Sequence, residues 1–400
     1  MEDTSAYRGA KQIRRVRQPD DVTARPSRCA VQNGWAPASM RYDRAPMSRH
    51  FHGRRAVSIE NDALRVTVLE EGGHIAEVLH KASGVNPLWV PHWPSVEPSA
   101  FDAARHAEFG TGADAKLLAG IMGHNVCLDI FGGPSEEEAA AGLTAHGEGS
   151  IAPYRVTASG HALTMQADFP LAGLRFVREL DLHVEGVRVR ERVENVAGCD
   201  RPIAWTQHVT LAPPFLQHGR TEFRASATRS KVFEGEFGPA DYLASSAEFE
   251  WPRAPRIDGG TSDLRRYTDA PVSSAYTAHL MDPSREDAFF VAFTPEFELA
   301  FGYVWKQAAF PWMGIWEENR SRPHSPWNRQ AVTRGMEFGV SPFPETRRQM
   351  IDRGSLFGIP TYRWIPARSS VSVEYGIVAT DATTIPEALY FNAKASSSPA

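Results

Sequence analysis

The 400-residue sequence has no run of 18 apolar residues, so nothing in it predicts a membrane-spanning helix. No apolar core follows the early arginines, which argues against a secretory signal. Only three cysteines are present, and the odd number and wide spacing of Cys29, Cys127 and Cys199 suit a reducing compartment better than a disulfide framework. We therefore expect a cytoplasmic protein without a membrane partner.

Several familiar fingerprints are also missing. The sequence has no Gly-x-Ser-x-Gly elbow, no phosphate-cradling glycine loop and no dinucleotide motif. There is no Cys-x-x-Cys pair, and the spacing of His92, His106 and Glu108 matches no metal site that we can name. Glu317 and Glu318 are adjacent and point to opposite faces of a strand, so they cannot form the facing carboxylate pair of a glycosidase. We predict neither a metal nor an organic cofactor.

Charge is spread unevenly along the chain. The formal net charge is -5, but residues 1–55 hold 12 Lys and Arg against 5 Asp and Glu. This basic segment has few large apolar residues, so we expect a disordered N-terminal extension, followed by one domain over 56–393 and a disordered tail over 394–400. The acidic remainder gives no support for a nucleic-acid partner. A monomer and a homodimer both stay open.

What the sequence does contain is the residue pattern of β-strands and turns. Its 29 prolines and 31 glycines are scattered along the whole chain and favour many short strands with many turns. Apolar residues alternate in most segments, convincing helical periodicity is scarce, and only 134–142 starts like a short helix. Residues 91–117 are predicted to form a long irregular loop. The fold class is therefore mainly β, a large antiparallel β-sandwich, with strands expected over 56–69, 75–79, 155–167, 173–184, 186–193, 202–211, 288–293, 299–305, 313–316, 332–340 and 370–378.

Glu337 is the first candidate for chemistry. It lies on a predicted strand whose apolar face carries Val332, Met336, Phe338 and Val340. The opposite face is nearly bare around the carboxylate, because its neighbours there are glycines. A carboxylate on a rigid strand with open surroundings predicts a ligand site, whereas an exposed strand glutamate beside a bulge is the structural alternative.

Two histidines also lie among small neighbours and are candidates for a ligand site. His208 lies on a predicted strand between Thr206 and Thr210, on the face opposite the apolar residues. His146 precedes a glycine, which lets the backbone approach a ligand closely. Glu148 lies two residues further on and points the same way if the chain is extended. A structural strand or turn histidine is the alternative for each.

Tryptophans supply candidate binding surface. Apolar faces of sugars stack well on aromatic rings, and Trp327 lies in a polar stretch where core packing is a weaker explanation. We predict substrate contacts from Trp327, Trp316 and Trp93, together with Glu148.

The ordered landmarks resemble those of the aldose 1-epimerase (galactose mutarotase-like) superfamily over about residues 57–392. Five motifs in the right order carry the resemblance: Glu71-Gly72-Gly73-His74-Ile75; Phe131-Gly132-Gly133-Pro134 with His146-Gly147; Val193-Glu194-Asn195 with Pro202 and His208; Met313-Gly314-Ile315-Trp316 with Gly335-Met336-Glu337; and Ile365-Pro366-Ala367.

The resemblance implies a galactose mutarotase-like supersandwich, a small sugar as substrate and no cofactor. It implies Glu337 as catalytic base, His208 as acid, and His146 as a second histidine that holds the sugar or shares the acid role. It offers Asp258, Asp263 and Asp269 for a mid-chain aspartate and no residue for a substrate-binding arginine. A non-catalytic carbohydrate-binding protein stays open, as does a lyase or glycosidase with a second carboxylate or a tyrosine from 91–117.

Overall fold

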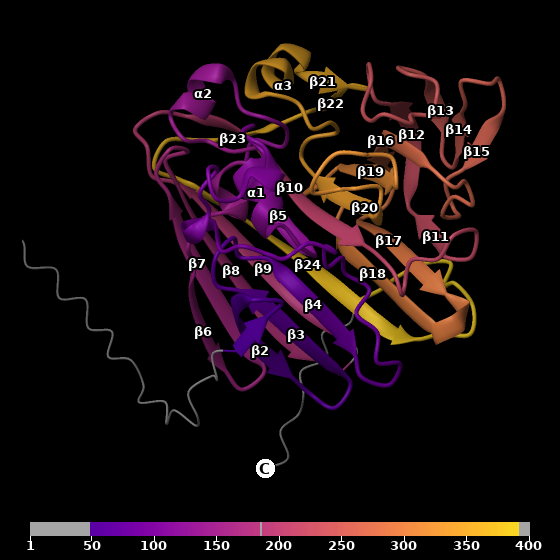
Figure 1. The fold of residues 1–400 in the computed structure, drawn as a ribbon, viewed down its shortest axis with the longest axis horizontal. Coiled ribbons are helices and arrows are strands. Elements are labelled where there is room, and N and C mark those ends of the chain that lie inside the picture. Colours follow the sequence, from indigo (N-terminus) through magenta and orange to yellow (C-terminus); the bar gives the residue numbers. More distant parts are fainter. Residues whose placement is uncertain (1–48, 185, 392–400) are drawn as a thin grey trace, which may run out of the picture. The chain divides into compact units, whose positions relative to one another are not determined.

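Residues 49–184 and 186–391 are described by the structure, which is a computed structural model. A large antiparallel sheet runs through them (Figure 1). Its path is β1 (Arg49–Phe51), β2 (Arg54–Glu60), β3 (Leu64–Leu69), β4 (Ile75–His80), β5 (His124–Asp129), β10 (Arg201–Leu211), β20 (Val332–Gly339), β19 (Trp312–Asn319), β16 (Ser273–Met281), β12 (Ala227–Val232) and β13 (Glu248–Glu250), with β23 (Arg363–Ile365) paired to β10.

A second antiparallel sheet packs against the first. Its order is β11 (Glu222–Ala225), β17 (Asp287–Thr294), β18 (Leu299–Lys306), β24 (Ser370–Asp381), β9 (Gly186–Asn195), β8 (Leu174–His183), β7 (Ala162–Phe169) and β6 (Arg155–Ser159). Two small hairpins complete the strands: β14 (Arg253–Pro255) with β15 (Thr261–Asp263), and β21 (Ser355–Leu356) with β22 (Ile359–Pro360). The predicted mainly β antiparallel sandwich is confirmed.

Helices are short and few among the described residues. The α-helices are α1 (Ala115–Gly120), α2 (Glu136–Ala140) and α3 (Arg347–Arg353), and the 3-10 turns are η1 (Pro98–Ala100), η2 (Ala107–Phe109), η3 (Glu148–Ser150) and η4 (Pro295–Phe297). Helix α2 starts with a capping box in which Ser135 and Glu138 satisfy each other's backbone N–H groups, as the serine-glutamate pattern predicts. No helix in the described part of the chain is both long and apolar enough to cross a membrane.

Aromatic side chains fill the space between the two sheets. The ring of Trp305 stacks on Phe338 at 4.2 Å between ring centres, and Phe338 meets Tyr375 edge-on at 5.4 Å. The predicted apolar face of β20, which includes Met336 and Phe338, points into this core. The sandwich therefore uses one face of the large sheet for stability and leaves its other face for different contacts.

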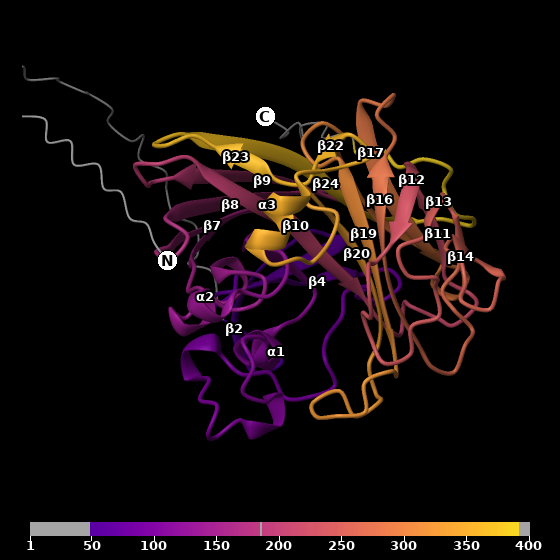
Figure 2. The ribbon, with the colours of Figure 1, turned by 90° about the horizontal axis from the view of Figure 1, so that it is seen from above.

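That other face carries a separate apolar cluster. Helix α1 and Trp89 pack there against Cys127 of β5 and Trp316 of β19. Figure 2 shows α1 on the side of β4 and β10 that lies away from β9 and β24. The site described below lies within this cluster.

The ordered strands begin earlier than expected. β1 and β2 start at Arg49 and Arg54, ahead of the predicted boundary at residue 56. The reason is that Arg54 is fully buried and donates to Glu97 at 2.9 Å and to the Gly120 carbonyl at 2.7 Å, so this basic residue is part of the domain. The rest of the predicted extension (1–48) and the tail (394–400) lie outside the described residues. The predicted loop 91–117 contains η1, η2 and the start of α1.

Candidate functional site

Strand register brings Glu337 and His208 together. The pairs Gln207–Phe338 and Thr210–Gly335 between β10 and β20 place His208 across from Glu337, with both side chains on one face. The Nε2 atom of His208 lies 3.0 Å from Oε1 of Glu337, and both side chains are buried. Two residues separated by 129 positions in the sequence thus form one hydrogen-bonded pair.

Burial controls the charge of this pair. Loss of solvent raises the pKa of Glu337 to about 8 and lowers the pKa of His208 to about 4, because both charged forms are disfavoured away from water. A 3.0 Å contact between the two groups needs one hydrogen between them. Between these two pH values the pair therefore holds a single proton, on the carboxyl or on the imidazole.

His146 completes a row of titratable groups. Its ring centre lies 4.8 Å from that of His208, and burial holds the pKa of His146 well below its usual range, so the ring is neutral. Its backbone is in the left-handed region (φ 64°), and its carbonyl accepts from Leu128 of β5 at 3.0 Å. A side chain at Gly147 would strike the backbone of Leu128, so this glycine is needed for the turn to approach the strand.

The glycines around Glu337 have a different role from the one expected. A Cβ atom at Gly335 would lie 2.7 Å from Oε1 of Glu337 and 3.1 Å from Cβ of Trp316, and one at Gly339 would lie 2.6 Å from Oγ1 of Thr206. The space that these glycines leave is therefore taken by neighbouring protein groups and by the carboxylate itself.

A cavity of about 240 Å³ opens above the pair. Its volume suits one small ligand. His146, His208 and Glu337 line it together with aromatic and polar residues from distant segments: Trp89, Trp316, Trp327, Tyr276, Asp114, Arg322 and His324.

Tryptophans form one wall of this cavity. Trp89 and Trp327 stack with ring centres 6.1 Å apart and an interplanar angle of 9°, and Trp316 meets Trp327 edge-on at 6.3 Å. Trp93 lies behind this wall, where its indole N–H donates to the Leu118 carbonyl at 3.1 Å. Trp316 and Trp327, two of the predicted substrate-binding residues, thus line the cavity, and Trp93 does not.

Glu148 also departs from expectation. It lies in the 3-10 turn η3, and its carboxylate accepts a hydrogen bond of 2.8 Å from the backbone N–H of Ala172. Because the turn is not extended, Glu148 does not point the same way as His146, and it does not line the cavity. We therefore withdraw it from the substrate-binding set.

Arg322 is a cavity residue that the sequence did not reveal. Its Nη1 donates to Glu318 at 3.1 Å, and its guanidinium lies 4.8 Å from the ring centre of Trp327. These contacts hold a cationic hydrogen-bond donor in the lining of the cavity. The segment 320–324, with two arginines and a histidine beside Trp327, is the sequence signal that could have indicated it.

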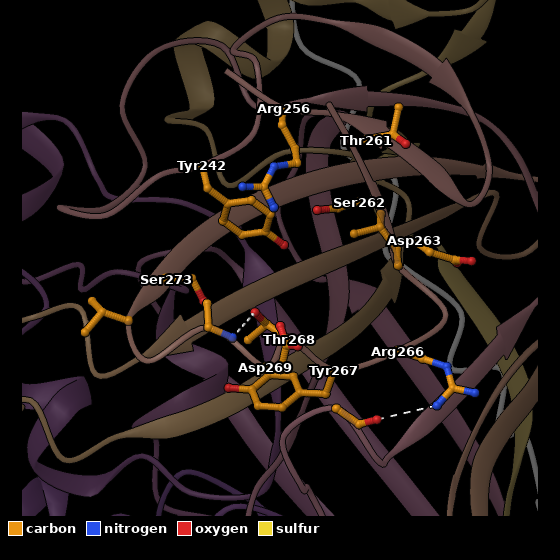
Figure 3. Close-up of a pocket in the computed structure, with 14 residues that line it drawn as sticks. Tyr242, Arg256, Thr261, Ser262, Asp263, Arg266, Tyr267, Thr268, Asp269 and Ser273 are labelled. Atoms are coloured by element: carbon orange, nitrogen blue, oxygen red, sulfur yellow. Dashed lines mark hydrogen bonds between the residues drawn. The ribbon is translucent and has the colours of Figure 1, made fainter. Parts of the chain in front are cut away.

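The candidate aspartates lie elsewhere. Asp263 and Asp269 line a larger hollow of about 470 Å³ together with Tyr242, Arg256 and Tyr267 (Figure 3). No histidine lines that hollow. Asp263 is already paired with Arg265 at 2.6 Å. We place the candidate site at the smaller cavity because it alone of the two contains an acid-base pair.

No three His, Cys, Asp or Glu side chains in residues 49–184 and 186–391 are grouped so that they could hold a metal ion. Polar atoms without a hydrogen-bond partner do gather near His208: the amide of Asn125, which is opposite His208 on β5, Oγ1 of Thr206 and Nδ1 of His146. Buried polar groups are usually satisfied, so such a group of exceptions is typical of a binding site.

Solved structures share this architecture. A "putative aldose 1-epimerase" from Klebsiella pneumoniae superposes with a TM-score of 0.57 at 14% identity, covering 83% of this chain and 80% of that one. One of the same description from Escherichia coli K12 gives 0.55 at 14% identity, covering 81% and 98%. A galactose mutarotase related enzyme from Lactobacillus acidophilus gives 0.53 at 13% identity, covering 83% and 99%.

The chain has the galactose mutarotase-like fold. No family model matches the sequence, and no curated protein does. At these identities the likeness establishes the fold alone, and the chemistry of the cavity depends on its own residues.

Proposed function

We propose that this protein is an aldose 1-epimerase-like isomerase that interconverts the two anomers of a small sugar. The observation that carries the proposal is the Glu337–His208 pair, with its 3.0 Å contact, in the lining of a tryptophan-walled cavity. An acid and a base on adjacent strands are what opening a cyclic hemiacetal requires.

The proton balance of the pair fits a reversible ring opening. Between about pH 4 and pH 8 the proton rests on Glu337, and the reactive form arises when it moves to His208 across their 3.0 Å contact. Glu337 then takes the proton of the anomeric hydroxyl while His208 gives its proton to the ring oxygen, and the bond between C1 and the ring oxygen breaks. The aldehyde then rotates about its C1–C2 bond. Closure on the other face returns the proton from Glu337 to O1 and that of the ring hydroxyl to His208. The pair carries one proton before and after the turnover.

The other cavity residues have binding roles in this proposal. Trp327 and Trp316 offer ring faces to the apolar side of the sugar, and Arg322 and His146 offer polar atoms to its hydroxyls. The sugar is then held in one orientation, with its anomeric hydroxyl and ring oxygen next to Glu337 and His208, and this positioning favours proton transfer.

The direct experiment is polarimetry on a panel of freshly dissolved aldoses. The purified protein should speed the approach to anomeric equilibrium for at least one aldose. If no aldose responds at any pH between 5 and 8, the isomerase proposal fails.

Asp114 favours a second candidate function. It comes from the segment 91–117 and lines the same cavity as Glu337, so two carboxylates face one space. A hydrolase or lyase acting on an oligosaccharide uses such a second group. Release of new reducing ends from oligosaccharides, abolished in Asp114→Asn, would support this function, whereas anomer exchange without cleavage excludes it.

A further inference from the structure

Tyr276 reaches the Glu337–His208 pair across the face of the sheet, over Gly314. It lies on β16, is almost fully buried, and is separated from Glu337 on β20 by the strand β19. The residue of β19 paired with Glu337 is Gly314. A Cβ atom at Gly314 would collide with Oη of Tyr276, would lie 2.8 Å from its Cζ, and would be 3.4 Å from Oε2 of Glu337.

Because Gly314 has no side chain, the phenol of Tyr276 can lie beside the carboxyl of Glu337. A strand interior normally disfavours glycine, because glycine loses backbone entropy and packs nothing. Here the absent side chain is replaced by the hydroxyl end of a tyrosine from the next strand. The arrangement gives each oxygen of Glu337 its own neighbour: His208 at Oε1 and Tyr276 on the side of Oε2.

The tyrosine hydroxyl has two acceptors and one proton. It donates to the Pro342 carbonyl at 3.2 Å, and it also lies beside the Glu337 carboxyl, because a Cβ atom at Gly314 would touch both the hydroxyl and Oε2 of Glu337. A phenol can donate to only one of them at a time. The favoured acceptor depends on whether Glu337 is ionised, because a carboxylate is a stronger hydrogen-bond acceptor than the peptide carbonyl of Pro342.

We propose that Tyr276 is a positioning residue for Glu337, and that its hydroxyl turns from the Pro342 carbonyl to the Glu337 carboxylate each time Glu337 gives up its proton. When Glu337 is protonated, the hydroxyl donates to Pro342 and leaves Glu337 free to bond with His208. This inference deepens the proposed function, because it assigns a partner to the base of the reaction, and it rests on that function for its kinetic consequence.

The electrostatics around Glu337 explain why such a partner matters. Burial raises the pKa of Glu337, and donation from the Tyr276 hydroxyl to the carboxylate form opposes this rise. His208, Cys127 and Glu345 are the other titratable groups nearest to Tyr276 and Glu337. The cavity is also lined by His146, Asp114, His324 and Arg322, and Arg322 is paired with Glu318. The Cys127 thiol and the buried imidazole are uncharged near neutral pH, and a neighbouring carboxylate repels charge, so none of these stabilises a carboxylate at residue 337 as a cation would.

The test compares wild type with Tyr276→Phe and Gly314→Ala. Phenylalanine removes the hydroxyl and keeps the ring, and alanine keeps the hydroxyl but pushes it away from Glu337. Tyr267→Phe is the control, because Tyr267 is an equally buried tyrosine whose hydroxyl has no partner in the described part of the chain and which lies outside the cavity.

The measured quantity is the pKa of Glu337, followed by the carbon resonance of its carboxyl group in protein labelled on glutamate. The resonance is assigned by its loss in Glu337→Gln. Loss of a hydrogen bond to a charged acceptor should raise this pKa by about one unit in both variants and leave it unchanged in Tyr267→Phe. The alkaline limb of the mutarotation rate should move in the same direction, with about a tenfold lower rate at pH 6.

If Tyr276→Phe and Gly314→Ala fold normally and the pKa of Glu337 stays at its wild-type value in both, Tyr276 is a packing residue and the inference is overturned. If the pKa rises as expected but wild type catalyses no anomer exchange, the positioning role stands and the proposed function is the part that fails. The two proposals can therefore be judged separately.

Discussion

Two buried glutamates lie on adjacent strands of the large sheet and face opposite sides of it. Glu317 of β19 points toward Arg334 of β20, its partner in the strand register, and accepts from Ser273 at 2.6 Å. Glu337 points to the cavity, where its neighbours are His208 and Tyr276. Burial raises the pKa of both carboxyls, but only Glu317 has a cation that opposes the rise.

The difference teaches which buried carboxyl is structural and which is suited to chemistry. A nearby guanidinium favours the ionised form of a buried carboxyl, and such a group contributes to the fold but exchanges protons poorly. A carboxyl surrounded by neutral groups that can themselves give or take a proton is held near its switching point. The same sheet thus contains one glutamate of each kind.

The largest effect expected is on turnover. Glu337→Gln should lower the rate of anomer exchange by about 10²–10⁴-fold, because a positioned base is typically worth that factor. Glu317→Gln is the matched change on the opposite face and should leave turnover per folded molecule near wild type. Polarimetry on both variants decides the point, and equal losses would erase the distinction between the two carboxyls.

Stability should respond in the opposite way. Arg334→Met removes a fully buried cation and leaves Glu317 without one, which should cost about 3 kcal/mol in the free energy of unfolding. Urea unfolding measures the loss. The double variant Arg334→Met/Glu317→Gln should lose less than the sum of the two single changes, because the two residues are coupled. Full additivity would mean that Arg334 does not compensate Glu317.

The pH dependence of stability sharpens the contrast. The folded-state pKa of Glu337, about 8, lies above its ordinary value of 4.5, so the folded state holds a proton that the unfolded state releases in this range. Wild-type stability from this group therefore falls as pH rises from about 4.5 to 8. Glu337→Gln has no such proton, so its stability relative to wild type should increase by about 3–4 kcal/mol between pH 5 and pH 8, because each pH unit over which the folded state keeps the extra proton is worth about 1.4 kcal/mol. Thermal unfolding at pH 5 and pH 8 would show it, and a gain that shrinks with pH would contradict the assignment.

A smaller effect is expected from the aromatic wall. Trp327→Ala should raise KM for the sugar about tenfold with little change in kcat, because the ring binds substrate and does not exchange protons. Tyr242→Ala alters the larger hollow of about 470 Å³, which Asp263 and Asp269 also line, and should leave KM for the sugar unchanged. A KM increase in Tyr242→Ala but not in Trp327→Ala would show that the sugar binds in the larger hollow and not in the cavity beside Glu337.

Much of the fold could be predicted from alternation, since strands such as β10 and β20 show their apolar face directly in the sequence. Alternation nevertheless places Arg334 on the apolar face of β20, among Val332, Met336 and Phe338. The sequence gives no reason for a charged residue on that face. Its partner Glu317 is identified only by the register between β19 and β20, which a single sequence does not contain.

The candidate site was predictable where strands determine side-chain direction. Glu337 and His208 stand among small residues on strands, and the structure brings them together. Glu148 and Trp93 lie in a turn and a loop, where residue spacing does not determine direction. Tyr276 was missed because no strand was expected where β16 lies, although its same-face neighbours Ser274 and Ala278 are small.

Exchange spectroscopy on an equilibrated aldose tests the central claim most directly, because it observes transfer between the α and β anomeric protons without any coupled reaction. At pH 6 wild-type protein should produce exchange cross-peaks that grow with protein concentration, and the same amount of folded Glu337→Gln should produce none. Equal cross-peaks from both proteins would show that the Glu337–His208 pair is not the acid-base group of the reaction.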